Sequence, residues 1–97
     1  MRKITELAHH AFMNKTRFKK ENTEVRIING LPEMYLFGNR IATMDEIGNI
    51  SISSAGWTSR TTLERLSAFT RIRLNKGSYI INEQFRWTGE WLNLSKI

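Results

Sequence analysis

Apolar residues recur at helical spacing near the start of the chain. They are Ile4, Leu7, Ala8, Ala11 and Phe12. Positions spaced by three or four residues fall on one side of an α-helix and form an apolar stripe there. The pattern predicts an amphipathic helix over residues 3–18.

The period changes from 3.6 to 2 after Asn22, which indicates β-strands. Val25 and Ile27 then fall on one side of a strand, and Arg26 and Ile28 on the other. Residues 23–53 are predicted to form antiparallel strands, because their apolar positions alternate and glycine-containing turns interrupt them. We expect two of these turns at Asn29-Gly30 and Gly38-Asn39.

A second helix is predicted over residues 60–69. Thr61 and Glu64 have the spacing of a capping box, with Thr58 or Ser59 as alternative caps. The apolar positions Leu63, Leu66 and Phe69 are expected to face the sheet. On this assignment three polar side chains point to solvent: Arg60, Arg65 and Ser67.

The last part of the chain, residues 71–94, is predicted to be a hairpin and a tail. Two alternating segments, 71–74 and 78–81, flank the loop Asn75-Lys76-Gly77. The tail contains Trp87 and Trp91 and is expected to form a last strand or a flap that closes the core. The predicted fold is a single α+β domain over residues 1–97: a mainly antiparallel sheet of five or six strands with an N-terminal helix and a central helix.

The charge of the chain favours polyanionic partners. Its 97 residues carry a net charge of +6, and arginine supplies nine of the fifteen basic residues. Such an excess suits nucleic acid, a ribonucleoprotein or an acidic protein surface. The alternative is a soluble domain that is merely net positive. We expect the basic side chains to gather on one side of the fold as a docking face.

Several classes of protein are not expected. The chain has no cysteine, no apolar run long enough for a membrane span, and no signal-peptide pattern before Glu6, His9 and His10. Adjacent histidines point about 100° apart on a helix and cannot chelate one ion together. No serine lies in a nucleophile elbow and no glycine-rich loop could hold a phosphate. We therefore expect no catalytic residue, metal, cofactor or small-molecule substrate.

Two surfaces are candidate binding sites. In the first, Trp57, Arg60 and Arg65 receive an anion near the start of the second helix; alternatively, Trp57 covers one end of the core. In the second, Arg71 and Arg73 project from one face of a strand and form a positive stripe with Lys76 and Arg86. Tyr79 or Trp87 could add base stacking there. The alternative is an ordinary solvated sheet face.

Lys19 and Lys20 are a further candidate, because they follow the predicted N-terminal helix. Cations at a helix C-terminus could meet phosphates. They could equally serve only to complement the helix dipole.

One series of motifs resembles a small family of bacteriophage-encoded domains. The motifs are Leu36-Phe37-Gly38-Asn39-Arg40-Ile41-Ala42, Gly48-Asn49-Ile50-Ser51-Ile52-Ser53, Ala55-Gly56-Trp57-Thr58, Thr61-Thr62 and Arg65-Leu66. The similarity spans roughly residues 20–90, and it departs from the family pattern at Ser67, where asparagine is expected. This resemblance implies a phage accessory protein in the cytoplasm of an infected bacterium and assigns it no activity.

Together these features predict a non-enzymatic phage accessory protein that binds a host or phage macromolecule. The charge favours nucleic acid or a nucleic-acid-handling complex over other partners. Two alternatives stay open: a protein-only inhibitor of a host enzyme or defence system, and a homo-oligomeric structural module. Aromatic and arginine anchors would serve the former, and an uncovered edge strand the latter.

Overall fold

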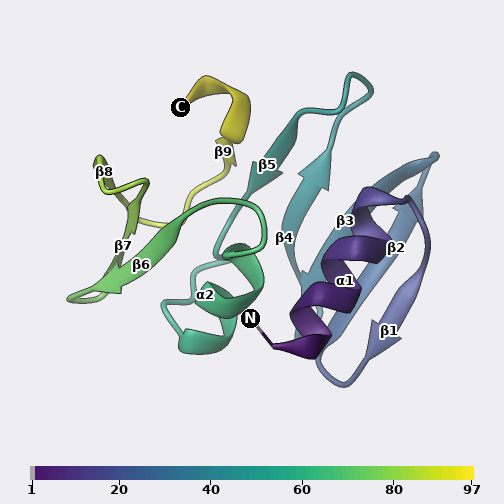
Figure 1. Cartoon of the computed structure of the whole chain (residues 1–97), viewed down its shortest axis with the longest axis horizontal. Coiled ribbons are helices and arrows are strands. Elements are labelled where there is room, and N and C mark those ends of the chain that lie inside the picture. Colours follow the sequence, from purple (N-terminus) through teal and green to yellow (C-terminus); the bar gives the residue numbers. More distant parts are fainter. Residues whose placement is uncertain (1) are drawn as a thin grey trace.

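The computed structural model describes residues 2–97 and shows an α+β fold (Figure 1). Its two α-helices are α1 (Lys3–Met13) and α2 (Arg60–Leu66). Its strands are β1 (Phe18–Lys20), β2 (Thr23–Ile28), β3 (Leu31–Leu36), β4 (Asn39–Met44), β5 (Ile50–Ile52), β6 (Ile72–Asn75), β7 (Ser78–Ile81), β8 (Phe85–Trp87) and β9 (Leu92–Asn93), and a short 3-10 helix, η1 (Leu94–Lys96), follows. The predicted α+β fold, with a mainly antiparallel sheet of five or six strands, an N-terminal helix and a central helix, is confirmed, and the main sheet has six strands.

The main sheet has the order β1-β2-β3-β4-β5-β9, and all its pairings are antiparallel. Helix α1 crosses one face of it, in front of β2 and β3 in Figure 1. Burial alternates along β3, where Met34 and Leu36 are buried and Glu33 and Tyr35 are only partly covered. Because one face packs against the helix, the other face is left to polar and charged side chains.

Two-residue turns set the register of the meander. The β2–β3 turn, Asn29-Gly30, and the β3–β4 turn, Phe37-Gly38, both have positive φ at their two central residues. This is the conformation that matches the twist of antiparallel strands. The predicted turn at Gly38-Asn39 is wrong by one residue, because Asn39 already pairs with Leu36 as the first residue of β4.

Helix α1 ends five residues earlier than predicted. Asn14 is its C-cap residue, Lys15 has a φ of 55°, and the amide of Thr16 donates to the carbonyl of Ala11. A residue in the left-handed region reverses the chain after a helix. The following residues form β1, so Lys19 and Lys20 lie on an edge strand and not at a helix terminus.

Helix α2 is also shorter than predicted, and its cap is one of the two predicted alternatives to Thr61. Its last residue is Leu66, so residues 67–69 of the predicted helix lie outside it. Ser59 is the cap, and its Oγ accepts a hydrogen bond from the amide of Thr62 at 3.2 Å. The capping box of Thr61 and Glu64 does not form, because Thr61 is already the second residue of the helix. The Glu64 carboxylate instead accepts from the amide of Arg2 at 2.6 Å.

The C-terminal residues divide between two sheets. Strands β6, β7 and β8 form a separate three-stranded sheet, while β9 pairs with β5 and completes the main sheet. The hairpin predicted over residues 71–81 is present, although its turn has two residues, Lys76-Gly77, because Asn75 pairs with Ser78. Tyr79 and Ile81 from this sheet join Phe12, Met34 and other residues in one core.

Candidate nucleic-acid interface

The outer face of the C-terminal sheet brings together four basic side chains that the sequence singled out. Arg73 pairs with Ile80 of β7, and Ile80 pairs with Arg86 of β8, so these three residues form a row across the sheet. Arg71 lies two positions before Arg73, on the same side of the chain. Lys76 lies in the β6–β7 turn, at the end of the face. All four cations are exposed.

One of these arginines is neutralised. Arg73 Nε donates to both carboxylate oxygens of Glu83, at 3.0 and 2.8 Å. The hydrogen bond from Arg73 is the largest cause that lowers the pKa of the Glu83 carboxyl, so this carboxylate stays charged at neutral pH. Within residues 2–97, Arg71, Lys76 and Arg86 form no ion pair. Their charges are available to an anion in solution.

The inner face of the same sheet holds the basic face in place. Tyr79 and Trp87 are buried there, with ring centroids 5.4 Å apart. The Tyr79 hydroxyl donates to the carbonyl of Trp57 at 3.0 Å, and Trp87 Nε1 donates to the carbonyl of Glu90 at 2.8 Å. The prediction that Tyr79 or Trp87 stacks on bases is therefore wrong, because neither ring is accessible.

Arg65 does not belong to any binding surface. It is 1% exposed, although the helical pattern predicted that it points to solvent. Its guanidinium donates to the hydroxyls of Thr23 and Thr5, at 2.8 and 2.9 Å, and to Asn22 Oδ1 at 3.3 Å. Burial is the largest cause that lowers its pKa. Arg65 is thus a structural cation that joins α2 to α1 and to the β1–β2 turn.

Trp57 and Arg60 do not form the predicted joint anion site. Trp57 is 56% exposed, so the alternative interpretation, that it covers one end of the core, is also wrong. It lines a hollow of about 480 Å³ with Phe37 and Ile41, whereas Arg60 lines a different hollow, with Arg2 and Glu64. A seven-residue helix such as α2 adds little dipole of its own to attract an anion.

Sequence reasoning missed two features of the surface. Phe37 is 66% exposed in the β3–β4 turn, beside the hollow that Trp57 lines. On the open face of the main sheet, Arg26 lies over the ring of Tyr35, 4.0 Å from its centroid, and Arg40 lies over Trp91 at 5.1 Å. Arg40 also pairs with Glu33 at 3.2 Å. The strand alternation could have placed these side chains on one face, although their cross-strand partners depend on the register.

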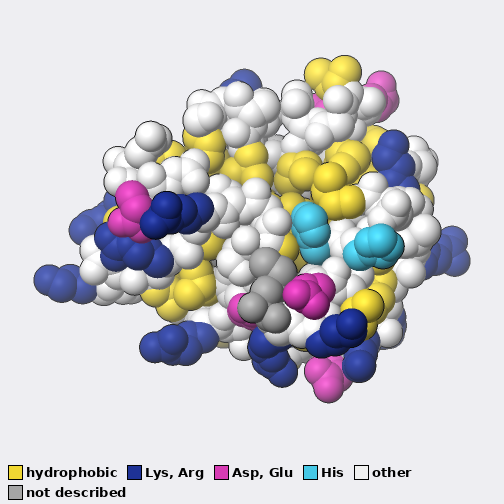
Figure 2. All heavy atoms as spheres, viewed as in Figure 1, with side chains coloured by type: hydrophobic (Ala, Val, Ile, Leu, Met, Phe, Trp, Pro, Cys, Tyr) yellow, Lys and Arg dark blue, Asp and Glu magenta, His cyan; other side chains and the backbone are white. Residues whose placement is uncertain are grey.

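The basic side chains do not gather on a single side. On the face drawn in Figure 2, Lys and Arg lie around the periphery in separate groups, one of them over the C-terminal sheet on the left. The pairing of β1 with β2 places Lys19 on a different sheet from Arg73. The expectation that all the cations gather on one side is wrong, and the C-terminal sheet carries only a smaller group of them.

The part of the chain that the structure describes holds no group of three or more His, Cys, Asp or Glu residues that could bind a metal ion. None of its helices is long and apolar enough to cross a membrane.

Comparison with known proteins gives one match. The model of the Kyanoviridae Gp96 protein family matches residues 1–95. No curated protein and no solved structure matches the chain.

Proposed function

The chain belongs to the Kyanoviridae Gp96 protein family, a family of phage proteins, and on that premise we propose that it is a non-enzymatic accessory protein that binds nucleic acid through the outer face of its C-terminal sheet. Its place of action in this proposal is the cytoplasm of the infected bacterial host. The bound molecule is host or phage nucleic acid, either free or held in a nucleic-acid-handling complex.

The observation that supports the proposal is the register of β6, β7 and β8. It sets Arg73 and Arg86 in one cross-strand row, with Arg71 and Lys76 on the same small sheet. Neighbouring strands in a sheet lie about 4.8 Å apart, so Arg73 and Arg86, two strands apart, are about 10 Å from each other. That spacing lets two side chains reach different phosphates of one backbone. Arginine also suits phosphate better than lysine, because its planar guanidinium donates in pairs.

Binding of this kind depends strongly on salt. Each phosphate that a cation neutralises releases counterions, and log K falls with log[salt] by roughly 0.9 per contact on duplex and 0.7 on single strands. Because Arg73 is paired with Glu83, three contacts, from Arg71, Lys76 and Arg86, predict a slope of about −2 to −3. With base stacking absent from this face, we expect little sequence preference.

The test is fluorescence anisotropy with a labelled 20-nucleotide single-stranded DNA, the same sequence as RNA, and the corresponding duplex, each at several salt concentrations. The variant R71E/R86E reverses two exposed charges that have no ion pair among the described residues. We expect it to weaken binding at least about tenfold and to reduce the salt slope by about 2.

The control variant is K3E/K96E. Lys3 on α1 and Lys96 in η1 are also exposed, so this variant changes the net charge by the same amount at sites associated with the main sheet. The proposal requires K3E/K96E to bind clearly better than R71E/R86E. Equal losses in the two variants would show that only net charge matters, and no binding by the wild type to any of the three probes would refute the proposal.

A second candidate function is inhibition of a host enzyme or defence protein by direct protein contact. The supporting observation is the pair of exposed aromatic side chains, Phe37 and Trp57, at the hollow of about 480 Å³. Large exposed aromatic residues beside an apolar hollow are typical of binding hot spots.

Pull-down from infected cells distinguishes the two candidates. A partner that is lost after nuclease treatment favours nucleic acid. A partner that survives nuclease and moderate salt, but is lost with W57S and kept with R71E/R86E, favours protein contact.

A further inference from the structure

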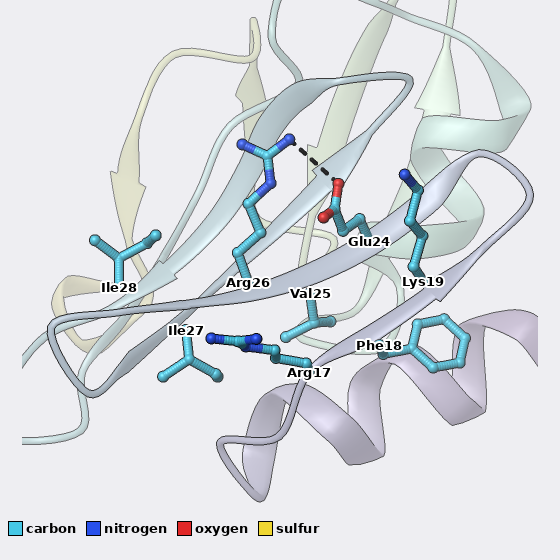
Figure 3. A pocket seen from close by; sticks show the side chains of 8 residues that line it. All are labelled: Arg17, Phe18, Lys19, Glu24, Val25, Arg26, Ile27 and Ile28. Atoms are coloured by element: carbon cyan, nitrogen blue, oxygen red, sulfur yellow. Dashed lines mark hydrogen bonds and ion pairs between the residues drawn. The ribbon is translucent and has the colours of Figure 1, made fainter.

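Strand β2 has a free edge over half of its length. Strand β1 pairs only with Thr23–Val25 of the six-residue strand β2. Its first residue, Phe18, lies opposite Val25, so β1 does not reach the second half of β2. The chain before Phe18 turns away toward α1. A hollow of about 470 Å³ remains beside the second half of β2, lined by Arg17–Lys19 and Glu24–Ile28 (Figure 3).

The register shows which backbone groups face this hollow. Lys20 and Thr23 flank the two-residue turn between β1 and β2, so they form a hydrogen-bonded pair. Because hydrogen-bonded and non-hydrogen-bonded pairs alternate in an antiparallel ladder, the backbone N–H and C=O groups of Thr23, Val25 and Ile27 point toward the β1 side. The backbone of Phe18 pairs with that of Val25, but β1 has no residue opposite Ile27. Ile28 and Leu31 flank the β2–β3 turn as a hydrogen-bonded pair, so Ile27 faces Pro32 of β3 at a non-hydrogen-bonded position and its N–H and C=O do not bond to β3. The N–H and C=O of Ile27 are therefore open to an added strand.

Three of the four charged side chains around this edge are cationic. Figure 3 shows Lys19, Glu24 and Arg26 on one side of β2, and Arg17 beside Ile27 on the other side. Arg26 forms an ion pair with Glu24 at 3.2 Å. Within the described residues, Arg17 and Lys19 form no ion pair. An occupant of this edge would thus have unpaired positive charge on both of its faces.

From this geometry we propose that the β2 edge binds an acidic extended peptide segment, which adds as a short strand opposite Ile27. The main chain of the segment pairs with the Ile27 amide and carbonyl, as in other cases of strand addition. A carboxylate on the residue opposite Ile27 meets Arg17, because residues opposite each other share a sheet face. Carboxylates on its neighbours meet Lys19 and Arg26 on the other face.

Charge also argues against a second copy of this chain as the occupant. Pairing two β2 edges would bring Arg17, Lys19 and Arg26 of each copy together, and like charges across a strand pair are destabilising. Lysine on an edge strand is a common means of preventing such self-pairing. An acidic partner converts the same charges into attraction.

The test uses two capped five-residue peptides, Ac-Glu-Val-Glu-Val-Glu-NH₂ and Ac-Lys-Val-Lys-Val-Lys-NH₂, titrated into ¹⁵N-labelled full-length protein. We expect the acidic peptide to shift the amide resonance of Ile27 and to slow its hydrogen exchange, and the basic peptide to do neither. The variant R17E/K19E should weaken binding of the acidic peptide about tenfold or more, since it reverses two rim charges. R71E/R86E, on the other sheet, should leave it unchanged.

Three results would overturn the proposal. Shifts of only Arg and Lys side-chain resonances by the acidic peptide, without slower exchange at Ile27, would indicate simple counterion binding. Protection of Ile27 as the concentration of protein alone rises would identify a second copy as the occupant. Protection of the Ile27 amide by a 20-nucleotide DNA and not by the acidic peptide would assign the edge to nucleic acid.

Discussion

Arg65 of α2 and Thr5 of α1 are sixty residues apart in sequence and joined by a hydrogen bond of 2.9 Å from Arg65 Nη1 to Thr5 Oγ1. Both residues are 1% exposed. Within the described chain no carboxylate pairs with this guanidinium; its partners are the two threonine hydroxyls and Asn22. A buried charge held by neutral oxygens depends on every one of those contacts.

Replacing Arg65 should therefore destabilise the fold. We expect R65A to lower the free energy of unfolding by about 2–4 kcal/mol, because it leaves a cavity and removes the guanidinium donor from the Thr5 and Thr23 hydroxyls. R65M fills most of the volume without restoring an N–H and should recover less than half of the loss. Urea denaturation measures both. The control is R60A, because Arg60 is an exposed residue at the start of the same helix, and it should change the free energy of unfolding by less than about 0.5 kcal/mol. An R65M protein as stable as wild type would contradict the role given to these hydrogen bonds.

Gly89 and Ser54 provide a test of close backbone approach. Gly89 has a φ of +100°, its carbonyl accepts from the amide of Ser54 at 2.9 Å, and a Cβ on Gly89 would lie 2.0 Å from Ser54 Oγ. We expect G89A to cost about 2–4 kcal/mol, from left-handed strain together with the clash. Thermal unfolding monitored by circular dichroism measures the loss.

Gly48 is the matched control for that prediction. It has a φ of +93° and nothing within 4 Å of an added Cβ. G48A should therefore show only the backbone strain, about 1 kcal/mol. Equal losses in G48A and G89A would show that the contact with Ser54 relaxes without cost.

His9 makes stability depend on pH. It packs edge-on against Phe69 at 5.2 Å, and burial, followed by the charge of His10, lowers its pKa below the usual 6.5. A histidine with a lowered pKa in the folded state binds protons more readily in the unfolded chain, so the stability that it contributes is present above about pH 6.5 and is lost as the pH falls through that value. H9F should remove this loss between pH 7.5 and 5.5 in urea denaturation. H10Q removes only the charge of His10, the smaller cause of the lowered pKa, and should keep most of the loss of stability at low pH. An H9F protein whose free energy of unfolding changes with pH as in the wild type would contradict the assignment of this pH dependence to His9.

Local sequence patterns predicted the parts of the fold that local geometry decides. The alternation of Arg71 and Arg73 with Ile72 and Leu74 placed both arginines on one face, and the register confirms that face. The period-2 pattern likewise predicted strands β2 to β5 of the main sheet, since a strand with one buried face must alternate, but β1 fell within the predicted N-terminal helix.

Long-range contacts decided what the sequence did not predict. The helical pattern put Arg65 on the solvent side of α2. In the structure, the hydroxyls of Thr5 and Thr23 and the amide oxygen of Asn22, all remote in sequence, make a polar environment for it inside the fold. The spacing of residues within the helix does not predict that environment. The division of the C-terminal strands between two sheets is likewise a matter of packing, because both sheets have the same alternating pattern.

Phe37 occupies a turn position that suits another residue better. Its φ of 51° and the +79° of Gly38 closely match those of Asn29 and Gly30 in the preceding turn, 53° and +80°. Asn-Gly is the preferred pair for such a turn, and an aromatic residue in the left-handed region is costly. Phe37 is also 66% exposed, so burial does not offset that cost.

We therefore expect F37N to stabilise the protein by about 0.5–1 kcal/mol in urea denaturation. The same variant should lose any protein partner that the Phe37–Trp57 hollow binds, because it removes one of its two exposed aromatic side chains. The converse exchange, N29F, should destabilise by a similar amount, since it introduces the same strain into a turn of the same geometry. A loss of stability in F37N would mean that the ring packs on the hollow strongly enough to outweigh its backbone strain, and Phe37 would then be a structural residue and not a binding anchor.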